Sequence, residues 1–319
     1  MTDYSAAQHE LITLRDFLRW TTSRFLEAGL FYGHGNDDAF NEASQLLLSA
    51  LYLPVHELPD VFLDARLTDT EKTNLLTLIE KRIEQRIPLP YLTHEAWFAN
   101  LPFYVDERVL IPRSPFAELI ENDFQPWLTS SENVHRILDL CTGSGCIAIA
   151  LAMAFDNAQV DAVDISEDAL AVAKINIDKH HLQDQVNPIH SDCWQALTPN
   201  EQYDLIVSNP PYVGADEMAA LPQEYRHEPA SALEAADNGL ALVEEILLHA
   251  ADYLSNDGLL FVEVGNTDLA VDDKWPEVAF VWLDFEFGGH GILCSRRQTV
   301  SPSNNAMLPR TIPLHSGKL

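Results

Sequence analysis

The feature that most restricts the fold of this chain is a regular alternation of strand-like and helix-like segments beginning at Val134. Short apolar runs end in polar or glycine-rich turns, and segments with helical periodicity follow them. Strands are expected over Arg136–Leu140, Gln159–Val163, Asn187–His190, Asp204–Ser208, Leu259–Val264, Ala279–Leu283 and about Ile292–Ser295, and helices over Cys146–Phe155, from about Ser166, and over Leu240–Leu254. This alternation predicts an α/β fold with a parallel sheet covered by helices on both faces.

The first hundred residues follow a helical period instead. Apolar residues at three- and four-residue spacing predict helices over about Tyr4–Leu30, Asp38–Leu51 and Thr68–Arg86. Aromatic and apolar pairs between Pro88 and Pro112 predict a β-hairpin that links two domains. We therefore expect a helical domain over residues 1–87, a hairpin linker over 88–112, an α/β domain over 113–300 and a flexible tail over 301–319.

The expected strand Asp204–Ser208 ends in the sequence Asn209-Pro210-Pro211-Tyr212. Open α/β sheets bind ligands at the carboxyl ends of their strands, and two prolines remove two N–H donors while fixing the backbone. The result is a stiff corner of hydrogen-bond acceptors beside an aromatic ring. It suits a planar NH2 group, on a carboxamide or on adenine, because both protons of that group need acceptors. The plainer interpretation is a strand followed by a proline turn.

A glycine-rich loop follows the first strand of the alternating region. Gly143 and Gly145 permit a tight turn in which backbone N–H groups and a helix N-terminus face a ligand. Asp164 follows Gly145 by 19 residues and could bind ribose hydroxyls. The same spacing also fits a dinucleotide fingerprint, so the loop alone does not separate NAD from other adenosine ligands.

Two further carboxylates favour one of these ligands. Asp139 precedes Gly143 by four residues, where it would oppose a pyrophosphate but attract the amino group of S-adenosylmethionine. Asp192, at the end of the third expected strand, would accept a hydrogen bond from the adenine amine. The sequence therefore indicates an S-adenosylmethionine site at this edge of the sheet.

The charge of the chain limits its partners. The sequence has 49 acidic and 19 basic residues and a formal net charge of -30. A field of that sign repels a nucleic-acid backbone and attracts a basic protein. The alternative is that the charge only provides solubility or reflects a salty or cold habitat.

Other bulk features point to a cytosolic protein. No apolar run approaches 18 residues, and Met1–Glu10 lacks the basic-then-apolar pattern of a signal peptide. The four cysteines form no Cys-x-x-Cys pair and have no histidine at metal-ligand spacing. Reduced, mostly buried thiols and no metal site are therefore expected.

The motifs taken together resemble a known family. Asp139 with the loop to Gly145, then Asp164, then Asn209–Tyr212, in this order, resemble class I S-adenosylmethionine-dependent methyltransferases of the HemK/Prm group, which methylate protein glutamine side chains. Members pair an N-terminal helical substrate-recognition domain with a seven-stranded Rossmann-like catalytic domain through a β-hairpin. The resemblance spans roughly Leu11–Gln298.

Several stretches point to one branch of that family, which acts on protein three of the large ribosomal subunit. The similar stretches are Tyr91–Thr93 with Trp97-Phe98, Phe103–Phe116, Glu224–Pro229 and Glu263–Asn266. The resemblance thus implies a basic ribosomal protein as partner. Cys141 departs from the pattern, because many methyltransferases have a glycine there, and a small side chain must fit beside the cofactor.

The resemblance implies direct in-line methyl transfer. Asn209 and Pro210 would hold the glutamine amide, with Pro211 stiffening the corner and Tyr212 packed on the substrate. The adenine would lie by Asp192 and Trp194. Arg113 and Arg226–Pro229 border the site only by analogy, and a structural salt bridge is the alternative for both.

Four other functions remain open. A small-molecule methyltransferase or an NAD enzyme would not need the helical N-terminal domain or the proline corner. The branch that methylates peptide-chain release factors usually has an acidic Pro-x-x-Thr-Glu segment where this chain has Ser114–Glu118. A DNA adenine methyltransferase could use the same corner on a flipped base but would need a basic cleft. A non-enzymatic ribosome-assembly scaffold could keep the fold without the reaction.

Overall fold

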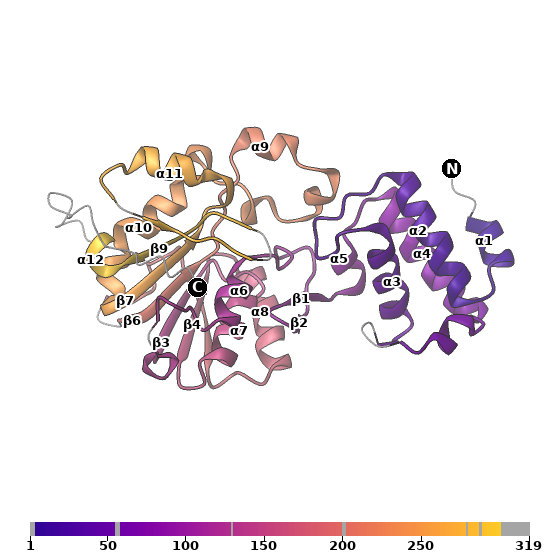
Figure 1. The fold of residues 1–319 in the computed structure, drawn as a ribbon, viewed down its shortest axis with the longest axis horizontal. Helices are drawn as coiled ribbons and strands as arrows, with labels where there is room; N and C mark the ends of the chain where they lie inside the picture. The colour runs from indigo at the N-terminus through magenta and orange to yellow at the C-terminus, as the bar shows by residue number, and fades with distance from the viewer. Residues whose placement is uncertain are drawn as a thin grey trace. The chain divides into compact units, whose positions relative to one another are not determined.

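The computed structural model describes residues 4–54, 58–128, 130–199, 202–278, 280–286 and 289–300, and the chain divides into two compact units (Figure 1). The first unit comprises the chain up to Trp97 together with Pro102–Arg113 and Leu221–Pro229. The second comprises Phe98–Leu101, Ser114–Ala220 and the chain from Ala230 onward. The proposed tail, residues 301–319, lies outside the described residues.

The first unit is built from helices. They are α1 (Tyr4–Glu10), α2 (Leu14–Ala28), α3 (Ala39–Ala50), α4 (Asp69–Glu84) and α5 (Leu89–Thr93), with a 3-10 helix at Asp60–Asp64. Their buried faces form one apolar core that includes Phe17, Phe25, Leu46, Leu75 and Ile79. The predicted helices over Asp38–Leu51 and Thr68–Arg86 are confirmed, within one or two residues at each end.

The single helix predicted over Tyr4–Leu30 is wrong, because Thr13 starts a new one. The Thr13 hydroxyl accepts from the Asp16 N–H, and the Asp16 carboxylate accepts from the Thr13 N–H at 2.9 Å. This reciprocal capping box fixes a helix start. The apolar spacing continues across the break, so periodicity alone did not reveal it.

The predicted hairpin is present but shorter than expected. Strands β1 (Ala96–Phe98) and β2 (Leu101–Phe103) pair around Ala99 and Asn100, both of which have positive φ. Tyr91 and Leu92, read as strand residues, lie in helix α5 instead. Pro90 near the start of α5 explains this, since proline is favoured in the first turn of a helix.

The second unit contains a seven-stranded sheet in the order β5-β4-β3-β6-β7-β9-β8. The strands are β3 (Arg136–Leu140), β4 (Gln159–Asp164), β5 (Val186–His190), β6 (Tyr203–Ser208), β7 (Leu254–Glu263), β8 (Val281–Trp282) and β9 (Ile292–Arg296). The first five in chain order are parallel, whereas β9 runs antiparallel to both β7 and β8. The predicted α/β fold with a seven-stranded sheet is confirmed, but the expected parallel direction does not hold for β9.

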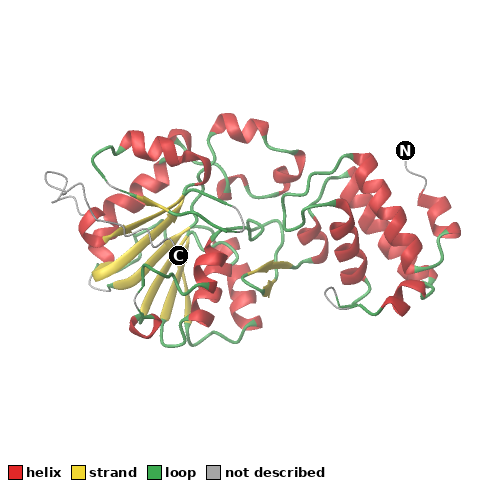
Figure 2. Cartoon of the chain, in the orientation of Figure 1, coloured by secondary structure: helices red, strands yellow, loops and turns green. Residues whose placement is uncertain are grey.

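Helices cover both faces of this sheet (Figure 2). The helices of this unit are α6 (Phe116–Glu121), α7 (Cys146–Ala154), α8 (Glu167–Lys179), α9 (Ala215–Ala220), α10 (Ala241–Tyr253), α11 (Asp268–Lys274) and α12 (Arg297–Val300). In Figure 1, α6, α7 and α8 lie on one side of the sheet and α10 and α11 on the other. Within the described chain, no helix is long and apolar enough to cross a membrane.

Candidate active site

The structure brings most of the predicted site residues to one edge of the sheet. Asp139 lies in β3, Asp164 ends β4, Asp192 follows β5 and Asn209 follows β6. These four strands are parallel neighbours, so their carboxyl ends meet. Ligands of open α/β sheets bind at such an edge, where the strand order reverses.

The glycine loop turns the chain from β3 into α7. Cys141, Gly143 and Gly145 all have positive φ, at 62°, 55° and 80°. At Gly145 an added Cβ would also stand 3.2 Å from the Ala173 Cβ, so a larger residue there would be strained and crowded. Cys141 adopts the left-handed conformation without being glycine, which is uncommon and marks a constrained turn.

Asp139 is the most perturbed carboxyl group of this edge. Its side chain is fully buried, and Oδ2 accepts from the Thr142 hydroxyl at 2.6 Å and from the Ala148 N–H at 3.1 Å. Burial raises the pKa of Asp139 to about 7. Oδ1 is buried and has no hydrogen-bond partner in the structure. A cationic or hydrogen-bond-donating ligand group would satisfy this orphaned oxygen.

Asp164 is held by the loop itself. One carboxylate oxygen accepts from the Gly143 N–H at 2.8 Å and the other from the Ser166 N–H at 2.9 Å. Burial raises the pKa of Asp164, against the opposing effect of these backbone hydrogen bonds. The two backbone hydrogen bonds fix the Asp164 carboxylate beside the glycine turn. The sequence predicts that this carboxylate binds the ribose hydroxyls of the cofactor.

The two residues expected near adenine differ in exposure. Asp192 is exposed and accepts from the Gln195 amide at 3.0 Å. Trp194 is only 5% exposed, stacks on Tyr253 with ring centroids 4.6 Å apart, and donates its indole N–H to the Glu245 carbonyl. Trp194 therefore has a packing role in the core, and its contact with a cofactor stays a prediction.

The corner after β6 is anchored at both ends. The Ser208 hydroxyl donates to the Leu140 carbonyl at 2.8 Å, which ties β6 to β3 just before Asn209. After the corner, Val213 exchanges backbone hydrogen bonds with the segment at Leu233 and Ala235. Pro210 is buried, and Asn209, Pro211 and Tyr212 are half-buried. The corner is therefore rigid but still reachable from solvent.

Tyr212 is positioned by Glu263, a residue to which sequence reasoning gave no role. The Tyr212 hydroxyl donates to Glu263 Oε1 at 2.9 Å, and the Ser114 hydroxyl donates to Oε2 at 2.5 Å. Glu263 is only 3% exposed and ends strand β7. The sequence does contain one indication of this role, because Glu263 is an acid inside the otherwise apolar expected strand Leu259–Val264. A carboxylate buried in this way must have hydrogen-bond partners.

Two glycines make room for Tyr212. A Cβ on Gly265 would lie 2.5 Å from the tyrosine ring, and one on Gly239 would lie 2.0 Å from the tyrosine carbonyl oxygen. Both glycines also have positive φ. The ring and backbone of Tyr212 are therefore enclosed by neighbours that allow one placement.

Arg113 and the segment ending at Pro229 form the structural salt bridge that was weighed as an alternative. Glu228 Oε2 accepts from Arg113 Nη1 at 3.0 Å and from the Ile111 N–H at 3.1 Å. Glu228 Oε1 lies 2.8 Å from His34 Nε2. Burial alone would raise the pKa of Glu228, but the His34 hydrogen bond and the Arg113 charge outweigh it and lower the pKa.

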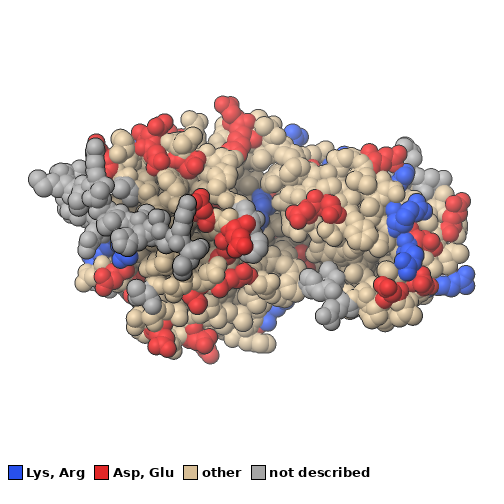
Figure 3. Space-filling model, in the orientation of Figure 1, with Lys and Arg blue, Asp and Glu red and all other residues tan. Residues whose placement is uncertain are grey.

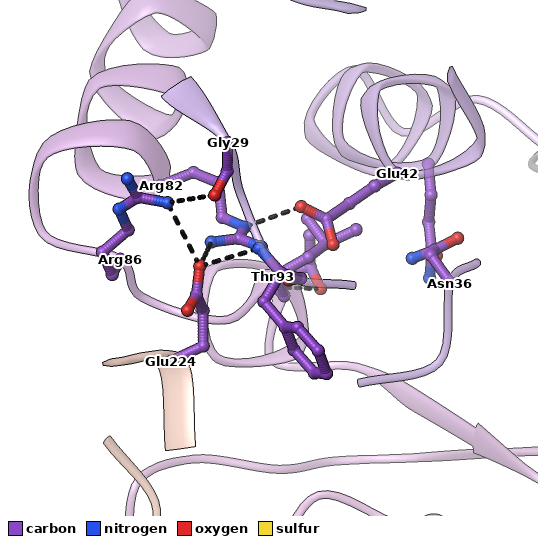
Figure 4. Close-up of polar contacts among 10 residues, drawn as sticks. Gly29, Asn36, Glu42, Arg82, Arg86, Thr93 and Glu224 are labelled. Carbon is purple, nitrogen blue, oxygen red and sulfur yellow. Dashed lines mark hydrogen bonds and ion pairs between the residues drawn. The ribbon is translucent and has the colours of Figure 1, made fainter. Parts of the chain in front are cut away.

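A second buried ion network holds the same segment within the first unit (Figure 4). Arg82 is 1% exposed and donates from Nε to Glu42 at 2.6 Å and from Nη1 to Glu224 at 3.3 Å. Arg86 also donates to Glu224, at 3.4 Å. Sequence reasoning missed Glu42, Arg82 and Glu224, because charged residues are usually exposed and their spacing gives no sign of pairing.

The surface of the second unit carries much of the acidity. On the face shown in Figure 3, Asp and Glu side chains form several separate patches over this unit. Among the described residues, no group of His, Cys, Asp and Glu side chains could hold a metal ion. All four cysteines are free thiols, with Cys146 and Cys294 buried and Cys141 and Cys193 half-buried.

The comparisons with known proteins agree with this geometry. The sequence profile described as the methyltransferase small domain matches residues 126–235, which include the glycine loop and the corner. This match and the seven-stranded sheet define the chain as a class I methyltransferase. The hMettl16 catalytic domain, a solved structure, is 15% identical with a TM-score of 0.48, covering 72% of this chain and 82% of its own, which is too weak to indicate a shared function.

Two relatives are far more similar. The ribosomal protein uL3 glutamine methyltransferase of Neisseria meningitidis is 48% identical over 296 residues, covering 92% of this chain and 97% of that protein. Its counterpart from Neisseria gonorrhoeae is also 48% identical, covering 92% of this chain and 98% of its own length. The chain belongs to the family of ribosomal protein uL3 glutamine methyltransferases.

Proposed function

We propose that this protein transfers a methyl group from S-adenosylmethionine to the side-chain nitrogen of a glutamine in ribosomal protein uL3. The observation that carries the proposal is the 48% identity, over nearly the full length of both chains, to enzymes named for that reaction. The rigid acceptor corner beside a glycine loop supports it, because the reaction needs a positioned amide next to a bound methyl donor.

The residues around the glycine loop fit the cofactor. The orphaned Asp139 oxygen offers an acceptor for the amino group of the methionine part, and Asp164 lies where ribose hydroxyls would be bound. Asp192 would accept from the adenine amine. Cys141 has a side chain small enough for the turn. When bound, the cofactor supplies a methyl group made electrophilic by its sulfonium.

The corner would orient the glutamine. The Asn209 side-chain carbonyl and the Pro210 backbone carbonyl accept one amide proton each, which directs the nitrogen lone pair at the methyl carbon. Pro211 keeps the two acceptors in place, and Tyr212, held by Glu263, packs on the amide face. No general base is needed before transfer, since the methylated amide loses its extra proton readily. Orientation in a site with little water is then the main source of the rate.

The charge of the chain suits a basic protein substrate. A net charge of -30 would attract a basic ribosomal protein and repel nucleic acid. We propose that the acidic surface assists capture of uL3, and that the reaction takes place in the cytoplasm, where ribosomal proteins are made and assembled. Lower affinity for uL3 at higher salt would be the direct sign of this attraction.

The test is methyl transfer from labelled S-adenosylmethionine, offered in parallel to purified uL3, a peptide-chain release factor and unmethylated DNA. Asn209→Ala removes one acceptor of the corner, and we expect kcat to fall about 100-fold or more with cofactor affinity unchanged. Asn133→Ala, at an exposed amide of the same unit, is the matched control and should keep full activity.

Each outcome has a distinct meaning. Label on a uL3 glutamine, lost in Asn209→Ala, supports both the substrate and the role of the corner. Label on the release factor alone would keep the chemistry and overturn the substrate. Label on DNA would contradict the charge argument, and no label on any of the three would favour the scaffold.

A further inference from the structure

The first unit contains a cavity that the reaction does not use. It has a volume of about 330 Å³ and lies between the N-terminal part of α3 and the segments around Pro90, β1 and Pro112. All of its lining residues belong to the first unit. Small-molecule pockets begin at about 300 Å³, so the cavity can hold a long side chain together with a stretch of backbone.

Two side-chain amides in the cavity wall can form hydrogen bonds with a peptide backbone. The Asn36 amide donates to the Gln45 side-chain carbonyl at 2.9 Å, and both residues line the cavity. That bond uses an N–H of Asn36 and the oxygen of Gln45. It leaves in the same place a carbonyl acceptor on Asn36 and an NH2 donor on Gln45. A peptide group presents the complementary pair, one N–H and one C=O.

A carboxylate and an indole lie together in the same wall. The Trp97 indole N–H donates to Glu95 Oε1 at 3.2 Å, which holds the carboxylate beside the ring. Trp97 is 41% exposed, so this part of the wall faces solvent. The indole N–H lies in the ring plane, so the carboxylate is at the edge of the ring. A cation bound to this carboxylate by a charge-assisted hydrogen bond can also make a cation–π contact with the ring face. Lys and Arg are absent from the lining residues, and Glu95 is the single acid among them.

We infer that this cavity binds an extended segment of the protein substrate, with a Lys or Arg side chain paired with Glu95 over the Trp97 ring and the adjoining backbone on Asn36 and Gln45. The inference rests on the proposed function for the identity of that substrate. Pro90 and Pro112 supply rigid apolar walls for the aliphatic part of such a side chain. The cavity is thus a second recognition point, separate from the residues that hold the glutamine.

The test compares Glu95→Gln with Glu80→Gln. Both remove one negative charge from the first unit, but Glu80 is exposed on α4 and outside the cavity. The measurements are the Kd for fluorescently labelled uL3 without cofactor, KM and kcat for uL3, and the Kd for S-adenosylmethionine. Glu95→Gln should raise Kd and KM for uL3 about tenfold, equivalent to about 1.4 kcal/mol, without changing kcat or cofactor affinity. Trp97→Leu should act in the same direction, and Glu80→Gln should change the constants less than twofold.

The results separate this inference from the proposed function. If wild-type protein methylates uL3 and Glu95→Gln behaves like Glu80→Gln, the inference is overturned while the function stands. If wild-type protein binds uL3 without methylating it and Glu95→Gln weakens binding, the inference stands and the function fails. If wild-type protein neither binds nor methylates uL3, both are wrong. Unchanged thermal unfolding of the variants would show that the effects are local.

Discussion

Replacing Asp139 with asparagine tests whether this buried carboxyl group makes the cofactor-free protein sensitive to pH. Burial raises its pKa from 3.8 to about 7, against hydrogen bonds from Thr142 and Ala148. Between these values the unfolded chain has lost the proton and the folded chain keeps it, so the free energy of unfolding falls as pH rises. The contribution is fully present below 3.8 and is lost as the pH rises through about 7.

The size of the change in the free energy of unfolding follows from the raised pKa of Asp139. Each pH unit corresponds to about 1.4 kcal/mol, so the roughly two units between about pH 5 and pH 7 give a loss of about 3 kcal/mol. In Asp139→Asn the amide oxygen can still accept from Thr142 and Ala148. The new NH2 group takes the place of the orphaned Oδ1 and costs about 1–3 kcal/mol at every pH.

Urea unfolding of the wild type and Asp139→Asn at about pH 5, 6, 7 and 8 measures this effect. The difference between the two proteins should change by about 3 kcal/mol in favour of the variant as the pH rises, because other carboxyl groups cancel in the difference. A difference that stays constant across this range would refute the buried-acid argument. Cofactor binding near pH 6 should release a proton from the wild type and none from the variant, which calorimetry in buffers of different ionisation enthalpy detects.

Two further substitutions test the packing and the buried charges. Gly265→Ala places a Cβ 2.5 Å from the Tyr212 ring at a residue with positive φ. The free energy of unfolding should fall by about 1–3 kcal/mol, and kcat should fall as well. Wild-type activity in this variant would refute the tight enclosure of the ring. Arg82→Ala leaves Glu42 and Glu224 buried without their main cation. The free energy of unfolding, measured by urea denaturation, should fall by about 3–5 kcal/mol. A fall of less than about 1 kcal/mol would mean that water replaces the arginine.

The elements best predicted from the sequence are those set by local pattern. Strand β3 was predicted at its observed bounds, because Ile137, Leu138 and Leu140 give the mostly apolar pattern of a strand buried on both faces. Helix α4 begins within one residue of its predicted start at Thr68, where Thr68 and Glu71 form a capping box. The break at Thr13 was missed because the apolar spacing continues across it. Helix α5 was missed because its aromatic and apolar pair, Tyr91 and Leu92, resembles part of a strand.

The strand β9 was predicted, at about Ile292–Ser295, but its antiparallel direction was missed for a different reason. Its residues form the same kind of apolar run as the parallel strands, and strand direction depends on the connection and not on composition. The β-rich run predicts that a strand exists and is buried. It does not predict which neighbour it pairs with or in which direction.

In the candidate site, too, some positions follow from local sequence pattern and others depend on contacts between distant residues. Asp139 lies near the end of a predicted strand, and Asp164 and Asn209 directly follow predicted strands. Their common position at one edge of the sheet therefore follows from the sequence without knowledge of distant contacts. The placement of Tyr212 is instead a tertiary property. Its hydroxyl binds Glu263, 51 residues away, and Glu263 also binds Ser114, 149 residues away. The spacing of these residues in the sequence does not predict that their side chains form hydrogen bonds.

Ser114, Glu263 and Tyr212 form one chain of hydrogen bonds that links the motif after β6 to a distant segment. Both oxygens of a buried carboxylate are used, one for each hydroxyl, so moving Ser114 would leave a buried acceptor unsatisfied at a cost of about 1–3 kcal/mol. Placement of the tyrosine is therefore coupled to the segment that follows Arg113. The geometry that we propose for the four-residue motif after β6 therefore depends on a separate part of the chain, which fixes Tyr212.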